Sequence, residues 1–191
     1  DRWYMAEPMW ASDFVSPDGA RGLVVEGTPA VGIRDGWYWI DATREPRHFA
    51  TVWLPGEYPR DIRIRYTARV VGQGSRNINL LFHARLSEGD DGLTQSDRRT
   101  GEYGEYHLFP NYIFTYLGND RTRVRMRRDP GFELLDEAYF DGPVPLDRDI
   151  ELEVRVADGW IAFYELSPSP RLLLRYHDDH PLDGGRVGLR T

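Results

Sequence analysis

Short runs of alternating apolar and polar residues, separated by turn residues, recur along almost the whole chain. The clearest runs are 61–70 and 76–85, in which every second residue is apolar. A β-strand points successive side chains to opposite faces, so each run predicts a strand with one face toward a core. About a dozen such runs with regularly spaced turns predict an all-β, antiparallel two-sheet β-sandwich. A chain of 191 residues fits one such domain, spanning 1–191.

Composition excludes several classes of protein. The sequence has no cysteine, so it has no disulfide framework and no Cys-based zinc site. No apolar run approaches the ~20 residues of a membrane-spanning helix. The net charge of −7 argues against nucleic acid as a main partner. All 24 basic residues are arginines, so any site for an anion has to be a local cluster of Arg.

The sequence leaves the location and the oligomeric state open. No signal peptide is visible, but the chain starts at Asp1 without Met, as a chain with a cleaved leader would. We therefore expect a periplasmic or secreted protein, with a cytoplasmic protein as the alternative.

The polar side of the strand predicted at 76–85 is unusual for an ordinary surface. It brings Asn79, His83 and Arg85 onto one face, while the apolar residues face the core. Solvent-facing strands more often carry Thr, Lys, Glu and Ser. An amide, an imidazole and a guanidinium on one face therefore favour a ligand-binding groove. The alternative is a solvated face on which the histidine occurs by chance.

The segment 101–109 offers titratable residues for the same groove. As a strand, it would put Tyr103, Glu105 and His107 on one face. A histidine titrates near neutral pH, and a tyrosine takes part in proton transfer when a nearby arginine lowers its pKa. These residues are candidates for acid–base chemistry.

The segments 111–118 and 121–128 complete the candidate set. The second of them places alternate arginines on one strand face, among them Arg123 and Arg125. Such neighbours repel each other unless an anion or acidic residues on adjacent strands meet them. Tyr116, in the preceding segment, is a further candidate for substrate binding.

Several motifs resemble known carbohydrate-related proteins. The closing segments W-I-A-F-Y-E-L and G-R-V-G-L-R resemble the end of a concanavalin-A-like lectin/glucanase jelly roll. More narrowly, L-L-F-H-A-R, N-Y-I-F-T-Y-L-G and R-M-R-R-D-P-G-F resemble the YesU-like family, bacterial jelly-roll proteins found among polysaccharide-degradation genes. This resemblance implies a jelly roll with a concave groove and a role with acidic plant or algal polysaccharides. It fixes no catalytic residue.

The candidate residues suit β-elimination on a uronic acid, by a lyase or a dehydratase. Arginine neutralises the carboxylate because its planar fork binds both oxygens and stays charged. We expect His107 and Tyr103 to transfer protons with His83 assisting, and Arg85, Arg123 and Arg125 to hold the carboxylate. Further substrate contacts are expected from Asn79, Glu105 and Tyr116.

Two other classes of function remain open. A retaining glycoside hydrolase needs two carboxylates about 5–5.5 Å apart, and the sequence lacks the E-x-D-x-x-E signature common in jelly-roll glucanases. A non-catalytic, lectin-like module would use the same aromatic residues and arginines without an acid–base pair.

We expect the proposed elimination to need no cofactor, because arginine takes the electrostatic role that a metal would play. The acidic pair Asp90–Asp91 and the run H-D-D-H at 177–180 remain candidates for a structural calcium, although acidic turns are mostly solvated.

Overall fold

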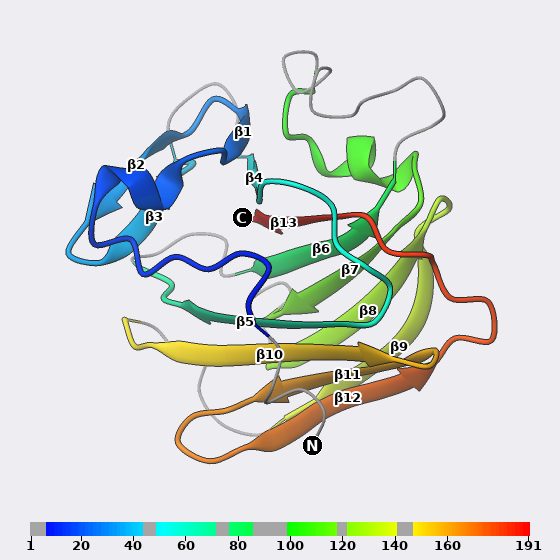
Figure 1. The fold of residues 1–191 in the computed structure, drawn as a ribbon. Coiled ribbons are helices and arrows are strands. Elements are labelled where there is room, and N and C mark those ends of the chain that lie inside the picture. The colour runs from blue at the N-terminus through cyan, green and yellow to red at the C-terminus, as the bar shows by residue number, and fades with distance from the viewer. Residues whose placement is uncertain (1–6, 44–48, 72–76, 86–98, 118–121, 141–146) are drawn as a thin grey trace.

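The computed structural model describes residues 7–43, 49–71, 77–85, 99–117, 122–140 and 147–191. Two antiparallel sheets pack face to face (Figure 1). This confirms the predicted β-sandwich. Among the described residues, no helix is long and apolar enough to cross a membrane.

The larger sheet has seven strands, and the smaller has four. The larger sheet runs in the order β1 (Val24–Gly27), β4 (Ala50–Trp53), β13 (Arg186–Arg190), β6 (Ile78–Ala84), β7 (Asn111–Tyr116), β8 (Arg123–Asp129) and β9 (Glu133–Tyr139). The smaller sheet runs in the order β12 (Arg171–His177), β11 (Trp160–Glu165), β10 (Ile150–Ala157) and β5 (Ile62–Ala68). The remaining elements are the hairpin β2 (Ala30–Arg34) and β3 (Trp37–Asp41) and the short 3-10 helices η2 (Pro17–Ala20) and η3 (Tyr103–His107).

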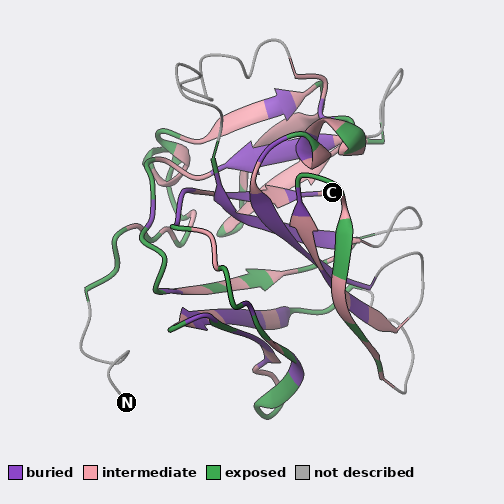
Figure 2. Ribbon diagram, turned by 90° about the vertical axis from the view of Figure 1, so that its right-hand side faces the viewer, coloured by how far each residue is buried: buried purple, intermediate pink, exposed green. Residues whose placement is uncertain are grey.

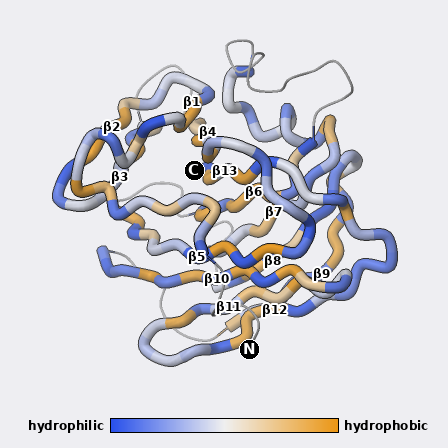
Figure 3. Tube along the Cα trace, in the orientation of Figure 1, coloured by the Kyte–Doolittle hydropathy of each residue, from blue (hydrophilic) through white to orange (hydrophobic). Residues whose placement is uncertain are grey.

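The main core lies between the two sheets. Ile78, Leu80 and Phe82 of β6 face it, as their alternation predicts. Phe114 of β7 and Phe163 of β11 stack across it, with ring centroids 3.8 Å apart. Figure 2 shows the buried residues concentrated along the strands of both layers, and Figure 3 shows hydropathy alternating along those strands. The sandwich therefore follows from the two-residue period of the sequence.

Buried tyrosines in this core hydrogen-bond to carboxylates that also pair with arginines. The Tyr112 hydroxyl donates to Asp178, which also accepts from Arg128. The Tyr116 hydroxyl donates to Glu165, at 3.1 Å. Tyr116 thus faces the space between the sheets. The prediction that it belongs to the substrate groove is wrong. Consecutive residues of a strand point to opposite faces, so Tyr116 faces the core while Thr115 faces outward.

Segment 101–109 is not a strand, contrary to our expectation. Tyr103–His107 form the 3-10 helix η3, which packs on the outer face of the seven-stranded sheet, the face turned away from the four-stranded sheet. Tyr106 is fully buried there, in a second apolar cluster with Trp53, Leu81 and Ile113. Burial of these apolar side chains against the sheet outweighs the alternating pattern of the segment.

Candidate active site on the outer face of the larger sheet

A row of polar residues crosses the outer face of the seven-stranded sheet. Each member is paired in register with the next across neighbouring strands. In sheet order, the row consists of Glu26, Thr51, Arg190, Asn79, Thr115, Arg125 and Glu137. All but Arg125 and Glu137 are buried.

The centre of this row is held by side-chain hydrogen bonds. Thr115 Oγ1 donates to Asn79 Oδ1 at 2.7 Å, and Asn79 Nδ2 donates to the Arg190 carbonyl oxygen at 3.5 Å. Arg190 Nη2 donates to the Gly101 carbonyl oxygen at 3.2 Å. Asn79 therefore lies on the face predicted for it, at the floor of the site.

The helix η3 brings Tyr103 and His107 over this floor. Its Tyr106 hydroxyl donates to Glu26 at 2.7 Å, and Asn111 Nδ2 donates to the carbonyl oxygens of Tyr106 and Phe109. These contacts fix the segment to β1 and β7. The Tyr103 and His107 rings then meet edge to face, with centroids 4.6 Å apart.

Arginines surround this pair of rings. The guanidinium of Arg190 lies 4.6 Å from the Tyr103 ring centroid. The His107 ring stacks on Phe132 at 3.8 Å, and the Arg127 guanidinium contacts the same Phe132 ring at 3.9 Å. We call the following group the arginine site: Asn79, Tyr103, His107, Thr115, Arg123, Arg125, Arg127 and Arg190.

The protonation states of the aromatic pair are set by burial and by the arginines. Burial lowers the pKa of His107, and the charges of Arg127 and Arg190 lower it further. Burial raises the pKa of Tyr103, although a hydrogen bond with Thr115 and the nearby arginine charges oppose that rise. At neutral pH the site therefore pairs a neutral imidazole with a protonated phenol. The first can accept a proton and the second can donate one.

The guanidinium groups on the outward face of β8 are not fully neutralised within the described part of the chain. Arg123 lies 3.8 Å from Glu137, and the Nε atoms of Arg123, Arg125 and Arg190 are buried without a hydrogen-bond partner among the described residues. Burial and the charges of Arg123 and Arg127 lower the pKa of Arg125. Clustered, partly desolvated cations of this kind favour an anionic ligand.

His83 does not join this group, and its expected place on the outer face is wrong. A register shift in the β6–β13 pairing lies beside it, and its φ of 52° breaks the alternation. Its ring therefore packs against the core residues Phe82 and Tyr112. Burial lowers its pKa to about 4.

Arg85 and Glu105 are also engaged elsewhere. Arg85 donates to the carbonyl oxygens of Gly184 and Asp183, which anchors the connection before β13. The Glu105 carboxylate accepts from the backbone N–H and the hydroxyl of Thr100, so it fixes the segment that enters η3. Neither side chain is directed to a ligand by these contacts.

Arg190 and Thr115 were not predicted as site residues from the sequence. Arg190 ends the last strand, and it reaches Tyr103 only because β13 lies between β4 and β6. Thr115 alternates normally with core residues of β7 and carries no distinctive motif. The sheet order that joins them is a long-range property, which local alternation cannot reveal.

The described residues contain no group of three or more His, Cys, Asp or Glu arranged to hold a metal ion. In the run 177–180, Asp178 is bound to Arg128 and Tyr112, and His177 pairs with Asp179 at 3.0 Å. Asp90 and Asp91 lie outside the described residues.

A buried carboxyl near the site should make stability depend on pH. Burial raises the pKa of Asp129 to about 6, and its Oδ2 lacks a partner among the described residues, while Oδ1 accepts the Phe132 N–H. A folded-state pKa above the unfolded value near 4 means that the folded protein binds this proton more tightly. The free energy of unfolding should therefore fall by about 2–3 kcal/mol as the pH rises from about 3 to about 7.

Asp129→Asn should remove that loss. We expect it to raise the free energy of unfolding at pH 7 by about 1–3 kcal/mol and to change little at pH 4, as measured by urea unfolding across this range. Asp179→Asn, at a side chain that is 84% exposed, is the control. Parallel pH profiles for wild type and Asp129→Asn would contradict the assignment.

Comparison with known proteins identifies a family and a fold. A family model described as "Domain of unknown function (DUF1961)" matches residues 7–157. A search of curated proteins gives no match.

Among solved structures, a Bacillus subtilis protein of unknown function with a galectin-like fold is similar, with a TM-score of 0.81, 21% identity, and coverage of 95% of this chain and 88% of the other. The carbohydrate-binding module CBM66 from B. subtilis has a TM-score of 0.56 and 13% identity, covering 89% and 87%. A Bacillus licheniformis β-glucanase has a TM-score of 0.60 and 11% identity, covering 94% and 82%. These likenesses confirm the concanavalin-A-like sandwich. They include both a binding module and an enzyme, so the fold does not choose between the two.

Proposed function

We propose that this chain, which belongs to the DUF1961 family, binds uronate-containing oligosaccharides at its arginine site and performs β-elimination on them. The observation that carries the proposal is an imidazole and a phenol, His107 and Tyr103, whose ring centroids lie 4.6 Å apart beside arginines with unpartnered Nε atoms among the described residues. A carbohydrate ligand agrees with the distant likeness to carbohydrate-binding and carbohydrate-cleaving proteins. The resemblance to YesU-like proteins points the same way.

In this proposal, Arg125 binds the substrate carboxylate, with Asn79 and Thr115 at the floor beside it. Neutralising the carboxylate makes the hydrogen on the adjacent C5 more acidic, and guanidinium groups stabilise the enolate that develops. The His107 imidazole, which stacks on Phe132, accepts the C5 proton.

Elimination is completed when the C4–O bond breaks. The electron pair of the former C5–H bond becomes the C4–C5 double bond, and the departing oxygen takes its proton from the Tyr103 hydroxyl. A departing sugar makes the protein a lyase, and departing water makes it a dehydratase. The unsaturated uronate absorbs in the ultraviolet.

Hydrolysis by a carboxylate pair has less support. Glu26 is bound by Tyr106 and Arg99, and Glu105 by Thr100. A retaining mechanism needs two carboxylates free to reach the scissile bond about 5–5.5 Å apart. Both of these carboxylates instead hold the segment that carries Tyr103 and His107.

The proposal is tested by screening uronate oligosaccharides for a new ultraviolet-absorbing product. The panel should contain oligomers of galacturonate, glucuronate, mannuronate and guluronate, with neutral oligomers of the same length as controls. We expect absorbance from at least one acidic substrate and from no neutral one. Binding of acidic oligomers without any turnover would instead support a non-catalytic, lectin-like module.

Arg125→Ala should weaken uronate binding by about 10- to 100-fold and lower turnover as well. A charge-assisted hydrogen bond to the carboxylate is lost in both the ground state and the transition state. Calorimetric titration measures the first effect and the absorbance assay the second. Arg65→Ala is a matched control, because Arg65 pairs with Glu151 on the other sheet. An equal loss of affinity for a neutral oligomer would contradict the assigned role.

A further inference from the structure

The edge strand β9 presents an exposed rim beside the arginine site. Its outward residues are those paired with the arginines of β8: Tyr139 opposite Arg123 and Glu137 opposite Arg125. Tyr139 is 60% exposed. This large aromatic side chain is exposed to water beside a cationic site, whereas the residues before and after it in the chain face the core.

Tyr139 contributes little to the packing of the fold. It belongs to neither apolar cluster, whereas Ala138 and Phe140 pack against the main core. Its hydroxyl lies 3.5 Å from Glu137 Oε1, and the Arg123 guanidinium lies 5.9 Å from its ring centroid. Both contacts are at the long end of their range. The exposed ring therefore keeps most of its apolar surface available to a ligand.

The order of residues along β8 places this rim relative to the acid–base pair. Arg127, Arg125 and Arg123 follow one another on one face, about 7 Å apart at each step. The Arg127 guanidinium contacts the Phe132 ring on which His107 stacks, whereas the Arg123 guanidinium lies over the Tyr139 ring. The acid–base pair thus lies toward Arg127, and Tyr139 lies at the opposite end of the row.

We propose that Tyr139 and Arg123 form a second subsite, which binds the sugar residue next to the one held at Arg125. The inference rests on the proposed function, because it takes the first sugar to be a uronate at Arg125. The Tyr139 ring packs against the apolar C–H face of the neighbouring pyranose. The Arg123 guanidinium, which lies 5.9 Å from the centroid of that ring and 3.8 Å from Glu137, donates to an oxygen of the same sugar.

A subsite at this position has a consequence for the length of the substrate. A monomer held at Arg125 leaves Tyr139 uncovered, whereas a dimer or trimer covers it. Affinity should therefore rise from monomer to oligomer, and that increment should depend on Tyr139. A lyase needs such a neighbour, because the bond it breaks joins C4 of the uronate to another sugar.

The test compares wild type with Tyr139→Ala and Tyr139→Phe in calorimetric titrations with monomers, dimers and trimers of the four uronates. Tyr139→Ala should leave monomer affinity unchanged and weaken trimer binding by about 3- to 10-fold, the range expected for one aromatic contact. Tyr139→Phe should keep wild-type affinity, because the ring face and not the hydroxyl makes the contact. Trp160→Ala, on the four-stranded sheet, is the control for loss of an exposed aromatic side chain.

The outcomes separate this subsite from the proposed function. Equal losses for monomer and trimer, or no loss for either, would overturn the subsite even if elimination is observed. A length-dependent loss without any absorbing product would support the subsite while overturning elimination. If no uronate binds to wild type, both proposals are wrong.

Discussion

Replacing His107 by alanine should lower kcat for elimination by about 10²- to 10⁴-fold with little change in substrate affinity, as expected for the loss of a general base. The imidazole is held in place by stacking on Phe132. Tyr103→Phe, which keeps the ring and removes only the acidic proton, should cause a loss in the same range. Stopped assays of the absorbing product at saturating substrate measure both.

The pH profile distinguishes this role from a structural one. Because burial and the arginine charges lower the pKa of His107, the neutral form should persist below pH 6.5, and kcat/KM should fall only on the acid side of that value. His107→Ala should abolish this acid limb. His180→Ala, at a histidine whose backbone contacts Asp178, is a control that should leave it intact. An acid limb that persists in His107→Ala would contradict the assignment.

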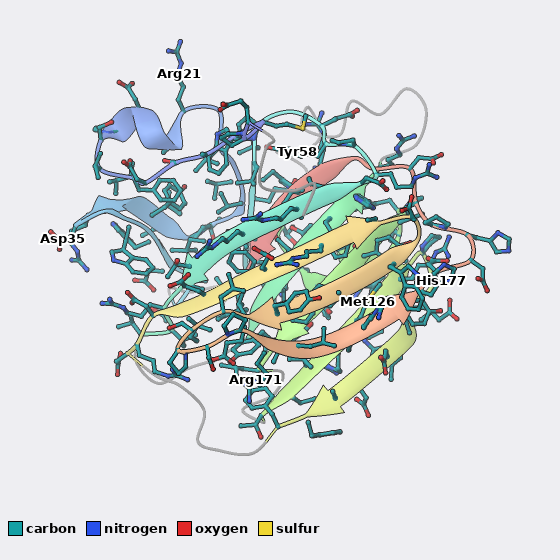
Figure 4. All side chains as sticks on the ribbon, turned by 60° about the horizontal axis from the view of Figure 1, so that its bottom comes forward. Arg21, Asp35, Tyr58, Met126, Arg171 and His177 are labelled. Atoms are coloured by element: carbon teal, nitrogen blue, oxygen red, sulfur yellow. The ribbon has the colours of Figure 1, made fainter. Side chains whose placement is uncertain are left out.

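The second large effect should be on stability. Asp178→Ala should lower the free energy of unfolding by about 2–4 kcal/mol, because it leaves the half-buried Arg128 without its carboxylate and Tyr112 without its acceptor. Asp178 follows His177, at the end of β12 opposite to Arg171 (Figure 4), so its bonds tie the four-stranded sheet to β7 and β8 of the larger sheet. Urea unfolding at pH 7 measures the change.

Asp179→Ala provides the matched control for that experiment. Its side chain is 84% exposed and pairs with His177, so its loss should cost less than about 0.5 kcal/mol. Equal midpoints for the two variants would mean that the buried contacts of Asp178 are not stabilising. Tyr112→Phe should fall between them, since it removes one hydrogen bond and keeps the ion pair.

The sequence predicted well which face of the sheet most strand residues point to. The outward position of Asn79 and the shared face of Arg123 and Arg125 both follow from a period of two. The same reasoning failed at His83, because a bulge in the pairing with β13 rotated that residue out of phase. A bulge of this kind cannot be recognised from the alternation of apolar and polar residues in the sequence.

The local structure predicted for the two acid–base candidates was wrong. Tyr103 and His107 were expected on a strand face, but they project from a 3-10 helix whose position is set by Tyr106 and Glu26. Arg190 was missed because its neighbours depend on the order of strands in the sheet. The sequence could suggest candidate residues by their chemistry. Which of them lie together depends on pairing between strands that are far apart in the sequence.

The central claim, elimination at the arginine site, is tested most directly by counting double bonds and new reducing ends in one reaction on a uronate oligomer. Ultraviolet absorbance measures the first and a reducing-sugar assay the second. We predict one double bond for each reducing end if a sugar departs, and double bonds alone if water departs. Reducing ends that accumulate without any absorbance would show hydrolysis and contradict the claim.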